Sequence, residues 1–127
     1  VREIECAIIG NSELLTSEIG EVSYETDWYD YDTKYNLANE ITIPAKVDSK
    51  ITQQIKEIAI NSCRALNIFG FARVDYFLEK SSNKVFLNEI NTIPGFTKKS
   101  MFPMLWRASG LNIEQLVAKL VDISQDS

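Results

Sequence analysis

The fold is decided by the stretch Phe71-Ala72-Arg73-Val74-Asp75-Tyr76-Phe77-Leu78 and by a second one soon after it, Lys84-Val85-Phe86-Leu87-Asn88-Glu89-Ile90. Both stretches are rich in aromatic and branched residues, which favour β-strands. The residues between them include Ser81-Ser82-Asn83, a short polar segment typical of a turn. The sequence therefore predicts an antiparallel hairpin.

The register of this hairpin determines which side chains meet. Side chains alternate between the two faces of a strand, so Arg73 and Asp75 share one face, as do Glu89 and Asn91. A turn centred on Ser82 places Asp75 opposite Glu89 and Arg73 opposite Asn91, all on one face. Slippage by one residue would move a whole set of side chains to the other face. The predicted site depends on this register.

Two carboxylates, an amide oxygen and a guanidinium would converge on that face. Such hard oxygen ligands suit Mg²⁺, which binds them at about 2.0–2.1 Å and usually shares them with substrate phosphates. Arg73 can bind a phosphoryl oxygen or a carboxylate through two N–H groups. The alternative is a surface hairpin with a merely charged face. Apolar flanks favour the magnesium and phosphate site: Phe69, Phe71, Ala72 and Ile93-Pro94-Gly95-Phe96.

The whole chain has 127 residues, which is about one domain. It enters a strand pattern directly at Val1, so we expect a part of a larger polypeptide. We find neither a membrane-spanning stretch nor a signal peptide pattern. A net charge of −5 disfavours nucleic acid as a partner. Cys6 and Cys63 give no disulfide framework, Cys63 reads as a small buried hydrophobe, and a reducing, cytoplasmic setting is expected.

The composition excludes several chemistries. There is no histidine, so the chain contains no Ser-His-Asp triad, no Cys-His pair and no His-ligated zinc. No Walker-type or dinucleotide-binding glycine pattern occurs either. Any nucleotide site must be built from strands, carboxylates and lysines.

The remaining pattern predicts an α+β domain with a mostly antiparallel sheet. Further strands are expected at residues 2–9, 21–24 and 41–44. A first helix is expected to begin at a cap formed by Asp48 or Ser49. A second helix is expected over residues 100–107, with an interruption near Pro103. A third is expected from Asn112, which has Gln115 three residues after it, to residue 123. The first and last helices have apolar faces that we expect in the core: Ile51, Ile55, Ile58, Ala59, Ser62, Leu66 and Ile113, Leu116, Val117, Leu120.

Residues 24–35 read Tyr-Glu-Thr-Asp-Trp-Tyr-Asp-Tyr-Asp-Thr-Lys-Tyr. Long ordered loops often act as lids over active sites. A lid with one lysine, Lys34, can close over a phosphoryl group while its rings exclude water. A disordered acidic loop is one alternative, but four rings in eight residues favour packing. A calcium loop is another, although the glycine and terminal glutamate of an EF-hand are missing around Asp27, Asp30 and Asp32.

The segment after Asn91 offers an oxyanion site. Pro94-Gly95 is expected to form a tight turn whose backbone N–H groups face an oxyanion. Ser100 opens the next helix, and a hydroxyl together with helix N-terminal amides suits a substrate carboxylate. A serine at this position is equally explained as a helix N-cap. The two interpretations of Ser100 stay open.

Three motifs together resemble the D-alanine–D-alanine ligases of the ATP-grasp superfamily. They are Tyr29-Asp30-Tyr31-Asp32-Thr33-Lys34-Tyr35, Arg73-Val74-Asp75 and Asn88-Glu89-Ile90-Asn91-Thr92-Ile93-Pro94-Gly95-Phe96-Thr97. The resemblance covers nearly the whole chain in order. It implies that residues 1–127 form the C-terminal part of the ATP-grasp domain, with packed helices and a long lid loop. The family's N-terminal and central domains are absent, so this chain alone is expected not to turn over.

The resemblance implies ATP-dependent phosphorylation of a D-alanine carboxylate and attack of a second D-amino acid's amine on the acylphosphate. The product would serve peptidoglycan precursor synthesis in the cytoplasm. Implied cofactors are ATP and two Mg²⁺ ions, or Mn²⁺ in their place, and the full-length enzyme would be a homodimer. Two other functions stay open: another ATP-grasp carboxylate–amine ligase, or a non-catalytic module that binds ligands through its acidic loop.

The same resemblance implies roles for the hairpin and the segment after it. Asp75, Glu89 and Asn91 would hold the metal ions that bridge the ATP phosphates. Arg73 would stabilise the transferring phosphoryl group and the tetrahedral oxyanion, and the Gly95 N–H would assist.

Nucleotide and lid contacts are implied elsewhere. Lys34 would contact the terminal phosphate, and Tyr35 would help to close the first-substrate side. Glu3 would lie near the ribose and Trp28 beside the adenine, while Asn88 would join Glu89 in the ATP site.

For the second substrate, the resemblance implies that Ser100 and the Met101 amide bind its carboxylate. Met101 and Phe77 occupy positions at which the family sets second-substrate choice. The D-serine branch of vancomycin-resistance ligases is therefore open beside D-alanine. Lys98-Lys99 is more basic than usual in the family. Tyr35 is retained, and this favours a peptide product over a D-lactate ester.

Overall fold

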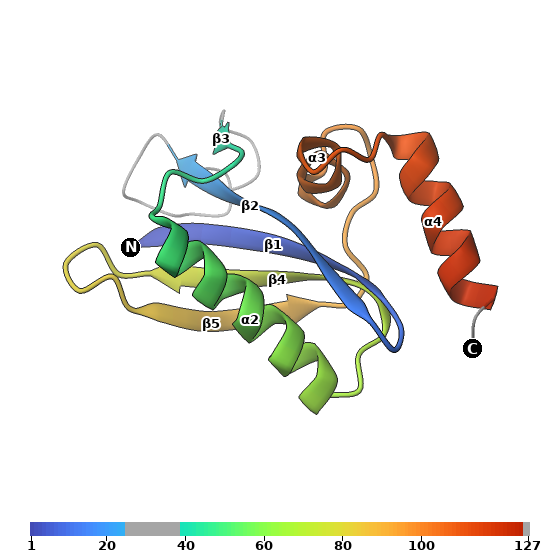
Figure 1. Cartoon of the computed structure of the whole chain (residues 1–127). Coiled ribbons are helices and arrows are strands. Elements are labelled where there is room, and N and C mark those ends of the chain that lie inside the picture. The colour runs from blue at the N-terminus through green and yellow to red at the C-terminus, as the bar shows by residue number, and fades with distance from the viewer. Residues whose placement is uncertain (25–38, 126–127) are drawn as a thin grey trace.

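The computed structural model describes residues 1–24 and 39–125, which form a five-stranded antiparallel sheet and three helices (Figure 1). The order of strands in the sheet is β3-β2-β1-β4-β5. The predicted α+β class is confirmed. The strands are β1 (Arg2–Gly10), β2 (Leu14–Tyr24), β3 (Asn39–Thr42), β4 (Gly70–Leu78) and β5 (Val85–Asn91), and the helices are α2 (Ser49–Ala65), α3 (Met101–Ala108) and α4 (Ile113–Gln125).

Helix α2 covers one face of the sheet (Figure 1). It begins where the Asp48 carboxylate accepts a hydrogen bond from the Ile51 N–H at 2.8 Å, which confirms Asp48 as the cap. Its buried side chains recur every fourth residue and meet the even-numbered residues of β1 and β4: Ile51, Ile55, Ala59 and Cys63. Leu66 was wrongly expected in this core; it lies beyond the last helical turn and is 63% exposed.

Helices α3 and α4 cover one end of the opposite face. Gly20 allows the close approach of α3, since a Cβ on Gly20 would lie 2.9 Å from Met101 Cε and 2.8 Å from Leu105 Cδ2. The interruption expected near Pro103 does not occur. Pro103 is the third residue of α3, where a backbone N–H has no acceptor within the helix, so the missing donor costs nothing.

Helix α4 begins as predicted. The Asn112 side chain accepts from the Gln115 N–H at 2.8 Å, and the Gln115 side chain accepts from the Asn112 N–H at 2.9 Å. Its expected apolar face was partly wrong: Leu116 is fully buried, but Val117 is 46% exposed. The helix packs against α3, β1 and β4 along a narrow stripe. Residues beside this stripe, such as Val117, therefore remain exposed.

Strand β2 is much longer than residues 21–24, the range predicted. The sequence signal is broken by Ser17, which is fully buried at a bulge between β1 and β2. There the Ser17 hydroxyl accepts a hydrogen bond from the Ala7 N–H at 2.9 Å. The hydroxyl thus provides a hydrogen-bond acceptor for a buried backbone N–H that has no strand partner at the bulge. Strand β3 also differs from residues 41–44, because it starts and ends two residues earlier.

The predicted pairing of the hairpin is confirmed: Asp75 lies opposite Glu89, and Arg73 lies opposite Asn91. The predicted centre of the turn on Ser82 was wrong. Near the turn the register shifts by one residue, because Asn88 is an extra residue in β5 between the pairs of Asp75 and Tyr76. This bulge restores the register that the site requires.

Candidate active site

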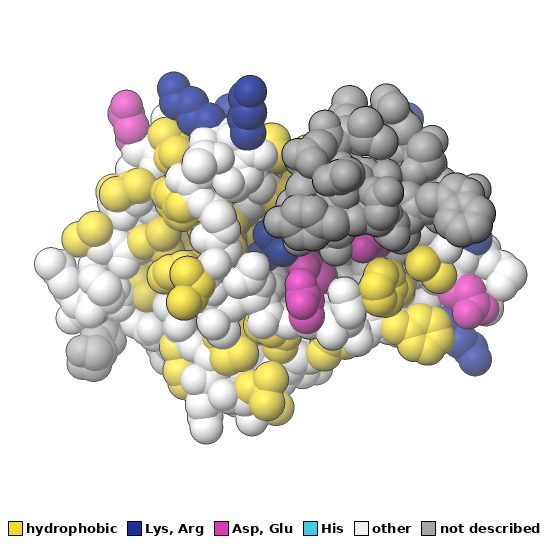
Figure 2. Space-filling model, turned by 180° about the vertical axis from the view of Figure 1, so that it is seen from behind, with side chains coloured by type: hydrophobic (Ala, Val, Ile, Leu, Met, Phe, Trp, Pro, Cys, Tyr) yellow, Lys and Arg dark blue, Asp and Glu magenta, His cyan; other side chains and the backbone are white. Residues whose placement is uncertain are grey.

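The part of the sheet that α3 and α4 leave uncovered carries a concentration of charge. Glu5 on β1 lies opposite Asp75 on β4, and Asp75 lies opposite Glu89 on β5, so three carboxylates occupy one row across three strands. One position along the same face, Arg73 and Asn91 form the next pair. Figure 2, which shows the face turned away from α2, has acidic and basic side chains gathered there.

Arg73 is the cation that lies beside this row. Its Nε lies 2.6 Å from Glu5 Oε1 and 2.9 Å from Asp75 Oδ1, and its Nη2 donates to Asp75 Oδ2 at 2.9 Å. The three side chains are only 19%, 12% and 15% exposed, for Arg73, Glu5 and Asp75. The hydrogen bonds to Asp75 raise the pKa of Arg73 above its ordinary value, partial burial opposes them, and the charges of Glu5, Asp75 and Glu89 add to the rise. Arg73 is therefore a fixed cation in an acidic row.

The donor set fits Mg²⁺ that shares its ligands with phosphates. Asp75 and Glu89 are directly opposed, so their Cβ atoms are separated by about 4.5–5.5 Å. The Asn91 amide oxygen, which accepts from the Ile93 N–H at 3.1 Å, adds a neutral oxygen. Among residues 1–24 and 39–125, no group of three or more His, Cys, Asp or Glu side chains could hold a metal ion. Two carboxylates and an amide leave coordination positions for phosphate oxygens and water, as Mg²⁺ prefers.

A hollow of about 400 Å³ adjoins these ligands and is lined by residues 89–93. It lies at the end of β5, where the strand gives way to the segment that leads to α3. The hollow provides room beside Glu89 and Asn91 for a ligand larger than a metal ion.

The segment after β5 differs from the prediction in its turn. Pro94 and Gly95 form no turn; the chain turns at Lys98 and Lys99, where the Ser100 N–H donates to the Thr97 carbonyl at 3.0 Å. A Cβ on Gly95 would lie 3.0 Å from Ser100 Oγ, which is a tight contact. The structure therefore brings Gly95 and Ser100 close together.

Ser100 occupies the N-cap position of α3, but its hydroxyl makes no cap hydrogen bond. It accepts from the Thr97 N–H at 3.1 Å and lies 2.8 Å from the Thr97 hydroxyl. The side chain of Met101 is 92% buried in the core beneath α3, so only its backbone amide belongs to the helix N-terminus. A hydroxyl and the first amides of a helix form an arrangement that binds carboxylates.

Other residues singled out from the sequence lie further along or outside the described part. Phe77 pairs with Glu3 and with Phe86 on the same face, one row beyond Asp75. Asn88 is the exposed residue of the β5 bulge. The predicted lid, with Trp28, Lys34 and Tyr35, lies within residues 25–38, outside the described residues.

Glu5 was missed from the sequence. The alternation of Glu3 and Glu5 in the first strand was a usable signal that both share a face. What the sequence did not reveal was the neighbour of that strand, because β1 and β4 are about seventy residues apart and pair only in the folded sheet.

Comparison with known proteins gives a consistent result. The family model described as "D-ala D-ala ligase C-terminus" matches residues 1–122. The D-alanine–D-alanine ligase of Prochlorococcus marinus (strain MIT 9312) is 87% identical over 125 residues, which are 98% of this chain and 35% of that protein. The D-alanine–D-alanine ligase of strain NATL2A is 48% identical over 126 residues, 98% of this chain and 36% of that protein.

Solved structures agree in fold. The VanG D-Ala:D-Ser ligase from Enterococcus faecalis superposes with a TM-score of 0.83 at 36% identity, covering 96% of this chain and 36% of that one. The D-alanine–D-alanine ligase from Coxiella burnetii gives a TM-score of 0.82 at 38% identity, covering 98% and 32%.

The chain thus has the fold of the C-terminal part of D-alanine–D-alanine ligases. The chain belongs to the D-alanine–D-alanine ligase family, and it spans about a third of the length of the relatives that it matches. No helix in the described residues is long and apolar enough to cross a membrane.

Proposed function

We propose that this chain supplies the metal- and phosphate-binding half of an ATP-dependent ligase that joins two D-alanine molecules for peptidoglycan precursor synthesis in the cytoplasm. The observation that carries the proposal is the convergence of Arg73, Asp75, Glu89 and Asn91 on the face of the sheet opposite α2, with Arg73 paired with Asn91 and Asp75 with Glu89. The names of relatives up to 87% identical support D-alanine as the second substrate.

In this proposal, Asp75, Glu89 and Asn91 would hold Mg²⁺, and Asn88 and Glu3 would contribute to the nucleotide site. The bound metal would neutralise phosphate charge. The phosphoryl group moves from ATP to a carboxylate oxygen of the first D-alanine, which releases ADP and leaves an acylphosphate. The amine of the second amino acid then displaces phosphate and loses a proton, so a peptide bond forms.

The chain's own groups stabilise the charge that develops in these steps. Arg73 carries five N–H donors, which its contacts to Glu5 and Asp75 do not exhaust, and it binds the oxygens of the transferring phosphoryl group. The Gly95 N–H binds the oxyanion of the tetrahedral intermediate. Ser100 and the Met101 amide orient the carboxylate of the second substrate. Lys34, Tyr35 and Trp28 belong to the proposed lid.

Further domains of the polypeptide would complete the site, because the relatives are almost three times as long as this chain. We therefore expect residues 1–127 alone to release no phosphate, and the full-length protein to form a homodimer. Light scattering on the full-length protein tests the dimer.

The test of the reaction is phosphate release by the full-length protein with ATP and Mg²⁺. We expect release with D-alanine alone, no further product with D-lactate, and at most a minor mixed product with D-serine. Preferential formation of D-alanyl-D-serine would reassign the second substrate. Release with other amino acids but not with D-alanine would indicate a different carboxylate–amine ligase and overturn the proposal.

A further inference from the structure

The acidic row contains one more carboxylate than metal binding requires. Glu5, Asp75 and Glu89 lie side by side on three adjacent strands. Like charges directly opposite each other destabilise a sheet unless a cation lies between them. In this structure the cation is Arg73, whose guanidinium contacts both Glu5 and Asp75.

The two contacts of Arg73 are not equivalent. Asp75 shares its strand and binds the guanidinium through both carboxylate oxygens. Glu5 reaches Nε from the neighbouring strand β1, at 2.6 Å. A carboxylate that binds a metal ion has less negative charge left for a guanidinium, because both cations draw on the same oxygens. When Asp75 binds a metal ion, the contact of Arg73 with Glu5 therefore keeps its full strength.

We propose that Glu5 is a positioning residue for Arg73. It holds the guanidinium over the acidic row when Asp75 binds Mg²⁺, so that Arg73 stays aimed at the transferring phosphoryl group. This inference rests on the proposed function, since it requires that Asp75 binds metal. Without Glu5, Arg73 has Asp75 as its remaining partner in the row and competes with the metal for it.

The test uses the full-length protein with the substitution Glu5→Gln, which keeps the size of the side chain and removes its charge. We expect kcat to fall by about ten- to hundredfold, the range for one hydrogen bond to a charged group. The KM for D-alanine should change by less than about threefold, because Arg73 acts on the phosphoryl group. Glu5→Asp, which retains the charge on a shorter side chain, should recover part of the rate.

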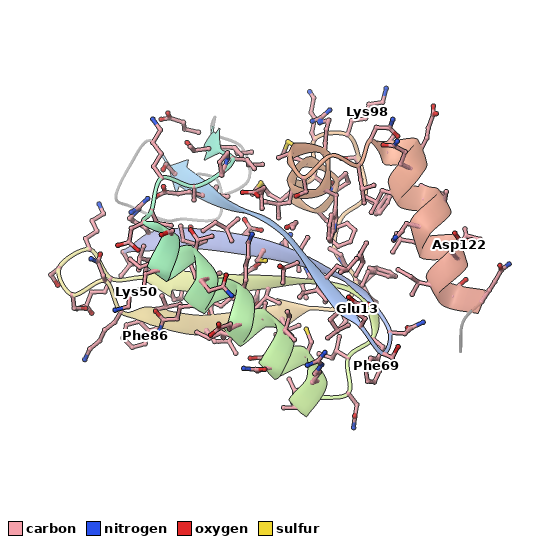
Figure 3. All side chains as sticks on the ribbon, in the orientation of Figure 1. Glu13, Lys50, Phe69, Phe86, Lys98 and Asp122 are labelled. Atoms are coloured by element: carbon pink, nitrogen blue, oxygen red, sulfur yellow. The ribbon has the colours of Figure 1, made fainter. Side chains whose placement is uncertain are left out.

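A double-mutant cycle separates positioning from general structural support. In an Arg73→Lys background the side chain lacks the planar fork that Glu5 and Asp75 share, so Glu5→Gln should lower kcat by less than about threefold. Equal effects of Glu5→Gln in both backgrounds would overturn the proposal. The matched control is Glu13→Gln, an exposed carboxylate at the β1–β2 turn (Figure 3), which should leave kcat unchanged.

The outcomes distinguish this inference from the proposed function. If the wild-type protein releases no phosphate with D-alanine, both the proposed function and this role of Glu5 are rejected. If the wild type is active and Glu5→Gln stays within twofold of it, only the role of Glu5 is rejected. A rate loss accompanied by an equal loss with Glu13→Gln would also reject the role, because it would show a nonspecific charge effect.

Discussion

The two faces of the sheet differ in what their residues do. On the face covered by α2, the even-numbered residues of β4, from Ala72 to Leu78, are at most 1% exposed and apolar apart from one tyrosine hydroxyl. On the opposite face, the odd-numbered residues Arg73 and Asp75 keep partial exposure and carry charge. In β4, alternate residues therefore contribute to the core and to the charged row. Substitutions on the α2 face should change stability, and those on the opposite face should change activity.

The largest effect is expected for Glu89→Gln, on the face of the sheet opposite α2. Loss of a metal-binding carboxylate should lower kcat of the full-length protein by about a hundredfold or more, since metal charge stabilisation contributes several kcal/mol. Glu89 is exposed and lies on the edge strand, so the unfolding midpoint should remain that of the wild type. Phosphate release and thermal unfolding measure the two properties. Near-normal turnover would reject the metal role of Glu89.

The converse, a loss of stability without a loss of activity, is expected for Ile55→Ala in the core between α2 and the sheet. Ile55 is fully buried between α2 and the sheet. Its truncation should lower the free energy of unfolding by about 2–5 kcal/mol, while kcat of the folded protein changes little. Urea unfolding of the full-length protein checks the first value. Gln54→Ala, one residue away on the exposed side of α2, is the control and should have little effect. A large fall in kcat with Ile55→Ala would show that the two faces are coupled.

A smaller loss is expected for Tyr76→Phe, also on the α2 face. The Tyr76 hydroxyl donates to the Ile55 carbonyl of α2 at 2.9 Å in a buried position. Removing it should cost about 1 kcal/mol of stability, the net contribution of a typical internal hydrogen bond. The urea midpoint measures this loss, and Phe77→Leu on the face opposite α2 provides the comparison. An unchanged midpoint in Tyr76→Phe would mean that the hydrogen bond contributes nothing net.

At neutral pH the smallest effect concerns the thiol of Cys6, because this effect develops only at alkaline pH. Burial raises the pKa of Cys6 to about 12 from an ordinary value of 9.0. The unfolded chain therefore releases the thiol proton first as pH rises, so this contribution to stability is complete below pH 9 and is lost between pH 9 and 12. At pH 9, iodoacetamide should modify Cys6 rapidly in urea-unfolded protein, and it should modify Cys6 slowly in native protein. A Cys6→Ala variant should lose less stability at alkaline pH than the wild type, and rapid native labelling would contradict the prediction.

Much of the fold could be predicted because its signals are local. The hairpin follows from two alternating stretches around a polar turn, and α4 follows from Asn112 and Gln115, three residues apart. The length of β2 could not be predicted, since Ser17 and Gly20 weaken its strand pattern. Both residues are explained only by distant neighbours: Ser17 binds the Ala7 backbone, and Gly20 makes room for α3.

The site shows the same division between local and distant information. Asp75, Glu89, Arg73 and Asn91 could be brought together from one hairpin. Glu5 could not be added to them, because its contact with Arg73 depends on the order of strands in the sheet. The closeness of Gly95 and Ser100 likewise depends on the path of the segment between β5 and α3.

The bulge at Asn88 has a consequence for how this hairpin can vary. Because the extra residue lies between the turn and Glu89, two residues of β5, Asn88 and Glu89, occupy the space opposite Asp75. Deleting Asn88 would leave Tyr76 opposite Leu87, and Glu89, now the next residue of β5, would still lie opposite Asp75. Straightening the bulge while keeping Asn88 would instead turn Glu89 and Asn91 to the α2 face. The site therefore tolerates the loss of this residue but not its incorporation into the regular ladder.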